Sequence, residues 1–185
     1  MTATPPPPFA IEPFEGARHN RANFACGIVQ VDNFFKKTAN KRARADHVRL
    51  YVMTAADGAL IGFYALNAHA VDYRDLSTAY ARSRPRHGSI PAAYLSMIGR
   101  DRRYAGQGFG GDLLVDALRR IDRAADALGI AVVMLDVLDY GDPQRVNRRK
   151  ELYESYGFLS LPSNPLRLFM PLKAVRTMIR RIDHL

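Results

Sequence analysis

The apolar positions along this chain switch between a period of about 3.6 residues and short unbroken runs, a pattern that predicts alternating helices and strands. The clearest helical stripe predicts a long helix that stops at Gly129, because glycine suits the position after a last helical turn. The members of this stripe are Leu113, Leu114, Ala117, Leu118, Ile121, Ala125 and Leu128. We expect a buried strand from Ile130 to Leu138 directly after it.

Two further helices are predicted by their boundaries and their spacing. Asp142 and Pro143 suit a helix start, so we expect a helix from there to about Tyr156. The apolar spacing over residues 31–42 predicts an earlier helix with a basic outer face.

Strands and turns complete the pattern. Two strands are predicted over 49–54 and 59–68, and the turn residues Ala56-Asp57-Gly58 join them into a hairpin. The other predictions are a polar loop or weak helix over 75–87, strands over 91–99 and 166–172, and a short basic helix over 173–181. This order predicts an α/β fold built on a mixed sheet.

The length and composition bound the organisation of the chain. A length of 185 residues suits one domain, and 48% apolar against 24% charged residues excludes a largely disordered chain. We expect a flexible Pro-rich lead-in over 1–10 and a single domain over 11–185. The single cysteine, Cys26, excludes an internal disulfide and favours a reducing cytoplasm. Neither a signal-peptide pattern nor an apolar run of membrane-spanning length is present, so we expect no membrane association.

The charge balance bears on the partners. The 27 Lys and Arg against 18 Asp and Glu give a formal net charge of +9. One basic cluster can serve solubility alone, but several in a small domain favour a polyanionic partner such as RNA, DNA or a phosphate-rich cofactor. The residues that we expect to contact RNA are Lys36, Lys37, Lys41, Arg42 and Arg44, followed by Arg84 and Arg86.

The most specific local feature is the glycine-rich segment from Arg103 to Gly111, which follows a predicted strand and opens the long helix. Its glycines let consecutive N–H groups turn toward one point, and a helix N-terminus adds a partial positive charge. The segment therefore predicts a phosphate or pyrophosphate site.

Two other interpretations of this segment stay open. Gly106, Gly108 and Gly111 also have the G-x-G-x-x-G spacing of dinucleotide folds, although too little chain follows for such a fold. The segment could also be a turn without a ligand. A P-loop is excluded because no Lys-Ser or Lys-Thr follows the glycines. The five histidines are scattered without metal-ligand spacing, so we expect no metal.

The glycine-rich segment and the residues downstream carry a resemblance to a known family. Arg103-x-x-Gly106-x-Gly108, with Asn147, Tyr153 and Tyr156-Gly157-Phe158, resembles the acetyl-CoA loop and other hallmarks of the GNAT acyltransferase superfamily. Over roughly residues 11–172 the chain looks like the GNAT-type toxins of bacterial toxin–antitoxin pairs. This narrower resemblance is carried by Phe24-Ala25-Cys26-Gly27, Val31-Asp32-Asn33-Phe34-Phe35, Asp101-Arg102-Arg103-Tyr104, Leu152-Tyr153-Glu154-Ser155-Tyr156-Gly157-Phe158 and Leu161-Pro162 with Pro165-Leu166.

The resemblance implies a fold, a cofactor and roles for individual residues. It implies a GNAT fold whose central sheet, flanked by helices, splays open to bind acetyl-CoA. It implies that Tyr153 is catalytic and protonates the departing thiolate, although Tyr153 also fits a buried stripe with Val146 and Tyr156. The implied coenzyme contacts are Ile98, Arg100, Arg103, Gly106, Gly108, Gly110, Gly111 and Asn147. The run Met97-Ile98-Gly99-Arg100 departs from the Arg-Leu-Ala-Val that such toxins often carry there.

The missing base on the strand before this loop bears on the substrate. No Asp or Glu occurs over 92–99. A lysine amine, with a pKa of about 10.4, would need such a base, whereas an α-amine of about 7.7 to 8.0 is already partly neutral. Together with the basic surface, this favours the α-amine of aminoacyl-tRNA.

The resemblance also implies a biological role. It implies a translation-inhibiting toxin that forms a homodimer and pairs with a small DNA-binding antitoxin. The alternatives are an acetyltransferase of protein N-termini or small amines, and a non-catalytic nucleic-acid-binding module.

Overall fold

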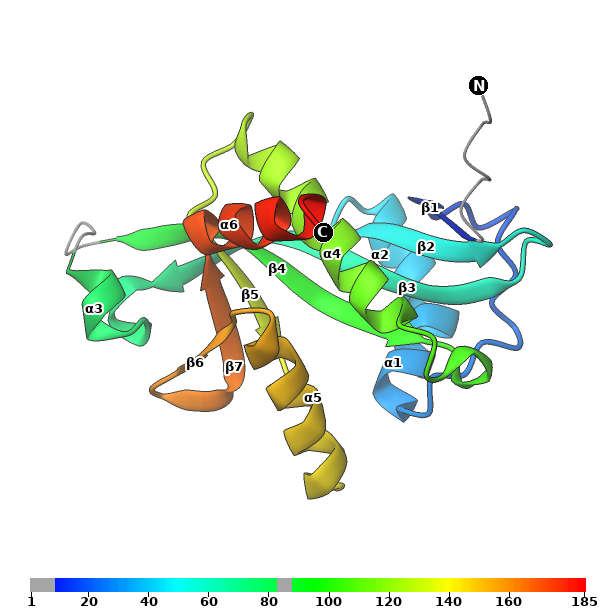
Figure 1. Cartoon of the computed structure of the whole chain (residues 1–185). Helices are drawn as coiled ribbons and strands as arrows, with labels where there is room; N and C mark the ends of the chain where they lie inside the picture. The colour runs from blue at the N-terminus through cyan, green and yellow to red at the C-terminus, as the bar shows by residue number, and fades with distance from the viewer. Residues whose placement is uncertain (1–8, 83–87) are drawn as a thin grey trace. The chain divides into compact units, whose positions relative to one another are not determined.

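The computed structural model describes residues 9–82 and 88–185 (Figure 1). Seven strands form one sheet in the order β1-β2-β3-β4-β5-β7-β6, with both parallel and antiparallel neighbours, and helices flank it. The predicted α/β fold with a mixed sheet is thereby confirmed. The chain divides into two compact units. The first unit holds the residues up to Leu66 and Met97–Asp116, and the second holds Asn67–Ser96 and Ala117–Leu185.

Antiparallel strands form the sheet of the first unit. β1 (Phe9–Pro13) pairs with β2 (Arg49–Ala55), and β2 pairs with the first part of β3 (Leu60–Asp72). The predicted hairpin is confirmed, and its turn places Gly58 at a φ of 82°, a conformation that glycine adopts without strain. β1 begins at Phe9, two residues before the predicted start of the domain at Ile11.

One continuous helical segment of the first unit contains an irregular turn. It consists of α1 (Val29–Asn33), η1 (Phe34–Thr38) and α2 (Ala39–Arg44), so it is longer than the helix predicted over 31–42. η1 is a turn of π-helix, in which the N–H of Ala39 donates to the carbonyl of Phe34, five residues earlier. Both Phe34 and Phe35 are buried next to this turn.

Aromatic rings fill the core of the first unit. The rings of Phe35 and Phe63 stack with their centroids 4.0 Å apart, and Phe24 meets Phe35 edge to face at 4.9 Å. Gly99 of β4 lies against this cluster, because a Cβ there would come within 2.8 Å of Val31 Cγ1 and 3.1 Å of Phe63 Cε1. The close packing of the core therefore explains why the chain carries glycine at this position.

The second unit contains the end of β3, the first part of β4 and the strands that follow. β4 (Ser89–Arg100) runs parallel to β5 (Val132–Asp136), from Ala92↔Val132 to Leu95↔Leu135. β7 (Asn164–Pro171) pairs antiparallel with β5 and with the short β6 (Leu159–Leu161). The helices of the second unit are η2 (Tyr73–Asp75), α3 (Thr78–Ala81), α5 (Pro143–Ser155) and α6 (Leu172–Asp183). α4 (Phe109–Ala125) belongs to both units, and η3 (Arg102–Tyr104) lies in the first.

Several predicted helix ends are confirmed and one is wrong. The carboxylate of Asp142 caps α5 by accepting the N–H of Arg145 at 3.2 Å, as the sequence predicts. α4, however, ends at Ala125 rather than next to Gly129. Leu128, assigned to its apolar stripe, is 67% exposed because the helix has ended before it can turn that side chain inward. β6 was not predicted, since three residues are too few to show alternation.

Candidate functional site

The glycine-rich segment forms the N-terminal approach to α4 in the first unit. Gly106 and Gly108 have φ values of 76° and 82°, and the space into which their Cβ atoms would project is open. The N–H groups of Gly111 and Asp112 both donate to the carbonyl of Gly108. Within the described part of the chain, the N–H groups of residues 106–110 have no hydrogen-bond partner. Five consecutive unpaired donors at a helix N-terminus suit an anionic ligand with several oxygens.

Asp101 fixes the start of this segment. Its carboxylate is 2% exposed and accepts the backbone N–H of Ala25 at 3.1 Å and that of Arg103 at 3.0 Å. The guanidinium of Arg103 adds two more hydrogen bonds, at 2.9 and 3.2 Å. Burial by itself would raise the pKa of Asp101, but the hydrogen bonds from Arg103 and Ala25 outweigh it and hold the pKa below its ordinary value. Asp101 is thus ionised at neutral pH and engages the charge of Arg103.

The other predicted coenzyme contacts of the first unit lie on either side of Asp101. Ile98 and Arg100 are half-buried at the end of β4, and the Arg100 guanidinium donates to the carbonyl of Asp101 at 2.9 Å. Gly110 and Gly111 occupy the first turn of α4. The first unit therefore brings seven of the eight predicted coenzyme residues onto one continuous stretch, 98–111.

The predicted catalytic tyrosine lies in the second unit, on α5. Tyr153 is 6% exposed, and its ring meets Phe158 edge to face with 6.1 Å between centroids. No hydrogen-bond partner for its hydroxyl exists among the described residues. Burial raises the pKa of Tyr153, an effect that the charge of Arg149 opposes, so the phenol keeps its proton at neutral pH. The structure thus confirms that Tyr153 is buried, and it also leaves the hydroxyl unpaired, as a proton donor to a ligand requires.

Asn147, the remaining predicted coenzyme contact, is on the same helix. It is exposed, six residues before Tyr153. At about 100° per residue the two side chains leave α5 in directions about 120° apart. The helix alone does not direct them to one point.

A polar network on the sheet of the second unit was not predicted. Asp136 of β5 accepts the hydroxyl of Tyr94 from β4, and it accepts two hydrogen bonds from the Arg167 guanidinium of β7, at 2.7 and 2.9 Å. Burial and the bond to Asp136 raise the pKa of Tyr94 to about 12. Burial alone would raise the pKa of Asp136, yet the bonds from Arg167 and Tyr94 lower it. The ring of His69 on β3 lies 5.2 Å from that of Tyr94.

The sequence held a signal for this network. Asp136 interrupts the apolar run predicted as a strand, and a carboxylate at such a position needs a partner. The absence of an acid over 92–99 does not exclude one on the neighbouring strand, and Asp136 lies there.

The predicted RNA contacts divide into two groups. The five from Lys36 to Arg44 are all exposed on η1 and α2, where one helical segment gathers their charge. Arg84 and Arg86 lie outside the described residues.

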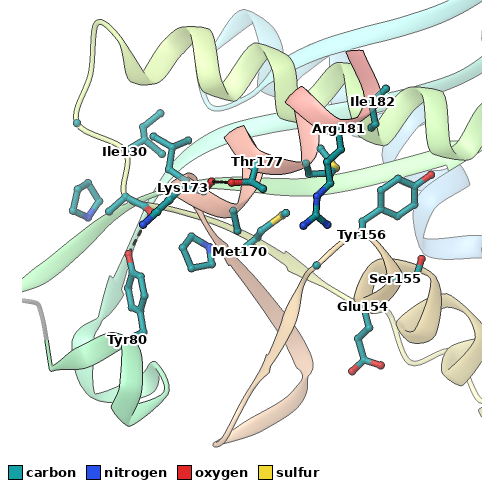
Figure 2. Close-up of a pocket in the computed structure, with 18 residues that line it drawn as sticks. Tyr80, Ile130, Glu154, Ser155, Tyr156, Met170, Lys173, Thr177, Arg181 and Ile182 are labelled. Carbon is teal, nitrogen blue, oxygen red and sulfur yellow. Dashed lines mark hydrogen bonds between the residues drawn. The ribbon is translucent and has the colours of Figure 1, made fainter. Parts of the chain in front are cut away.

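A hollow of about 1260 Å³ in the second unit lies along α6 (Figure 2). Met170, Met178 and Ile182 give it apolar walls, and Lys173 and Arg181 extend over it from α6. None of the predicted coenzyme or catalytic residues lines it. Over residues 9–82 and 88–185, no group of three or more metal-ligating side chains is found. No helix in that part of the chain is both long and apolar enough to cross a membrane.

Two known proteins are similar in sequence to this chain over most of its length. No family model matches the chain. The chain is 59% identical over 170 residues to a probable toxin TacT of Sinorhizobium fredii, covering 91% of this chain and 94% of that protein. It is 31% identical over 161 residues to a tRNA-acetylating toxin of Mycobacterium tuberculosis, covering 85% of this chain and 89% of that one.

Solved structures share the fold. The toxin AtaT in complex with acetyl-methionyl-tRNAfMet superimposes with a TM-score of 0.80 at 23% identity, covering 92% of this chain and 98% of that one. A mutant of the toxin KacT gives a TM-score of 0.82 at the same identity and coverage. The fold is that of the GNAT-type acyltransferases. With relatives of this identity and coverage, the chain belongs to the family of tRNA-acetylating GNAT-type toxins, as the resemblance predicts.

Proposed function

We propose that this protein transfers the acetyl group of acetyl-CoA to the α-amine of aminoacyl-tRNA and thereby inhibits translation. The observation that carries the proposal is the row of five unpaired N–H groups at the start of α4, in a chain that belongs to a family of tRNA-acetylating toxins. The toxin AtaT, which shares the fold, has been solved with an acetylated methionyl-tRNA and, as a mutant, with acetyl-CoA.

The first unit suits the binding of the coenzyme. A pyrophosphate offers several anionic oxygens, and the N–H groups of residues 106–110 offer a matching row of donors. Glycine at positions 106 and 108 leaves open space above the backbone, so the phosphates can approach it closely. Gly110 and Gly111 continue this surface into α4, while Ile98 and Arg100 would hold the pantetheine arm by their backbone groups. Asn147 of α5 would contact the same arm, as the family resemblance implies.

Arg103 has an indirect role in this proposal. Its guanidinium is engaged by Asp101, so it fixes the backbone of the segment and leaves most of the phosphate contact to the amides. Asp101 also ties the segment to Ala25, which keeps the donors in place before the ligand arrives.

Tyr153 holds the proton that the reaction needs. Acetyl-CoA supplies an activated acyl group and a sulfur leaving group. The unpaired hydroxyl of Tyr153 keeps its proton because burial raises its pKa, and it would donate that proton to the sulfur as the thioester bond breaks. A phenol is a suitable donor, since its ordinary pKa of about 10 is not far above that of a thiol, about 8.5.

The acceptor follows from the groups that surround the reaction. Asp136 lies on β5, next to the strand before the glycine-rich segment, but Arg167 and Tyr94 hold it ionised with a lowered pKa. Such a carboxylate is a weak base, so a lysine ammonium would keep its proton. An α-amine beside an ester needs no strong base, because it is already partly neutral near pH 7.

Membership of the family supports a proposal for the partners of the protein and for the compartment in which it acts. The exposed cations of η1 and α2 would attract the tRNA by charge rather than by base reading. AtaT has been solved with the C-terminus of its antitoxin AtaR and KacT with its antitoxin and DNA, so a small DNA-binding antitoxin is the expected partner here. We also propose a homodimer that works in the cytoplasm, where charged tRNA is found.

The test is transfer from labelled acetyl-CoA to total charged tRNA, followed by identification of the acetylated aminoacyl end. Wild-type protein should label the α-amine, and Tyr153→Phe should lower kcat by about 10²-fold or more. Phenylalanine keeps the ring packing against Phe158, so the variant should stay folded. Tyr156→Phe, three residues further on and just past the end of α5, is the matched control and should keep its activity. Equal labelling of lysine peptides and charged tRNA would contradict the assignment of the substrate.

A further inference from the structure

A second pocket, with a polar lining, lies in the first unit and is formed mostly by the segment between β1 and α1. Its volume is about 470 Å³. It is lined by Gly16, Ala17, Arg18, His19, Asn20, Arg21, Ala22 and Lys36. Among these lining residues there are two arginines and a lysine but no carboxylate, so the pocket is electropositive.

Arg21 is a partly buried cation of this pocket. Its guanidinium stands 4.9 Å from the centre of the Phe14 ring and 5.9 Å from that of Phe35, and it donates one hydrogen bond to the Phe35 carbonyl at 2.8 Å. Burial lowers the pKa of Arg21. Among the described residues it has no carboxylate partner, although burying a charge is costly unless it is paired.

Two other side chains of the pocket wall, Arg18 and His19, already have partners of their own. Arg18 forms an ion pair with Glu12. His19 is 3% exposed, accepts the N–H of Glu15 on Nδ1 at 2.9 Å, and lies 3.0 Å from Glu12 through Nε2. These bonds tie the pocket wall to β1. They leave Arg21 and Lys36 as the cations of the pocket that no described carboxylate neutralises.

We infer that this pocket binds a backbone phosphate of RNA, with Arg21 and Lys36 as its two cationic contacts. The stacked, planar guanidinium of Arg21 is preorganised for two oxygens of a phosphate, and Lys36 adds a mobile point charge. Lys36 begins the row of exposed cations on η1 and α2, so a strand of RNA on that row would pass the pocket mouth. Only the choice of RNA as the source of the phosphate rests on the proposed function.

Binding of RNA, measured apart from catalysis, tests the inference. The probe is a fluorescently labelled RNA hairpin ending in single-stranded CCA, titrated by anisotropy at several salt concentrations. Arg21→Met and Lys36→Met each remove one charge while keeping an apolar stem. The double variant should bind about tenfold or more weakly, and the slope of log affinity against log salt should fall by about two. Arg21→Lys should keep most of the slope.

Controls separate this result from unfolding and from the coenzyme site. Arg123→Met removes an exposed charge of α4 and should leave the binding of the hairpin unchanged. Acetyl-CoA affinity and thermal stability should be unchanged in all variants. Wild-type affinity and slope in the double variant would overturn the inference, and so would a loss of acetyl-CoA binding, which would assign the pocket to the coenzyme. If the pocket binds RNA but charged tRNA is not acetylated, the proposed function fails and the inference stands.

Discussion

Asp101 and Arg103, two positions apart, form a clamp in which one carboxylate accepts the backbone N–H and two guanidinium N–H groups, on Nε and Nη2, of the same arginine. The chain builds the same clamp a second time, with Asp72 and Arg74. The two differ in burial, because the Asp101 side chain is 2% exposed and that of Asp72 is 38% exposed. The second clamp is therefore a natural control for the first.

Asp101→Asn should destabilise the protein by about 2 kcal/mol, since buried hydrogen bonds to a charged group contribute roughly 1.5 to 3 kcal/mol. Asp72→Asn should cost less than about 1 kcal/mol, because exposed ion pairs contribute little. Chemical denaturation of both variants measures the difference. Equal losses would mean that burial does not strengthen the Asp101 clamp.

Gly99→Ala should cost about 1 to 3 kcal/mol, because its Cβ would overlap Val31 and crowd Phe63 in a packed core. Gly129→Ala is the matched control, since a Cβ there meets nothing within 4 Å. Thermal or denaturant unfolding of the two proteins decides the matter. An unchanged Gly99→Ala protein would show that the aromatic cluster can move aside.

The triple change Lys36→Glu, Lys41→Glu and Arg42→Glu should weaken tRNA acetylation, mainly through KM for the tRNA. Acetyl-CoA binding should persist, because the glycine-rich segment binds its ligand with backbone N–H groups. The triple change Arg123→Glu, Lys173→Glu and Arg180→Glu alters the net charge equally at other exposed positions. If both triple variants lose the same activity, net charge rather than this surface attracts the tRNA.

Burial of Tyr94 and its hydrogen bond to Asp136 make the folded protein less stable as the pH becomes alkaline. The pKa of Tyr94 rises from 10 to about 12 on folding, so the folded protein binds that proton more tightly than the unfolded chain does. The resulting stabilisation is complete below pH 10 and is lost between pH 10 and about 12. The melting temperature of the wild type should therefore approach that of Tyr94→Phe over this interval. A constant difference between the two would contradict the raised pKa.

The sequence was sufficient to predict a local conformation wherever a single residue determines it. The cap at Asp142, the turn at Gly58 and the positive φ values of Gly106 and Gly108 follow from their own chemistry. Each of these features depends on neighbours within a few residues, so the sequence displays it directly.

Features that depend on contacts between distant residues were harder to predict. The partners of Asp136 come from two other strands, and only the register of β4, β5 and β7 brings Tyr94 and Arg167 to it. The glycine at position 99 looked like a departure from the family, and only the packing against Val31 and Phe63 gives it a reason. The prediction for Leu128 was wrong because its spacing fits the stripe of α4, whereas α4 ends at Ala125, before this residue.

The π-turn between Phe34 and Thr38 holds one residue more than an ordinary α-helical turn. Deleting one residue there would restore α-geometry and leave α2 in nearly the same rotational phase, with Ala39 still facing the core and Lys41 and Arg42 on the face that they occupy now. Homologues without the π-turn would therefore present the same cations from a helix that is one residue shorter.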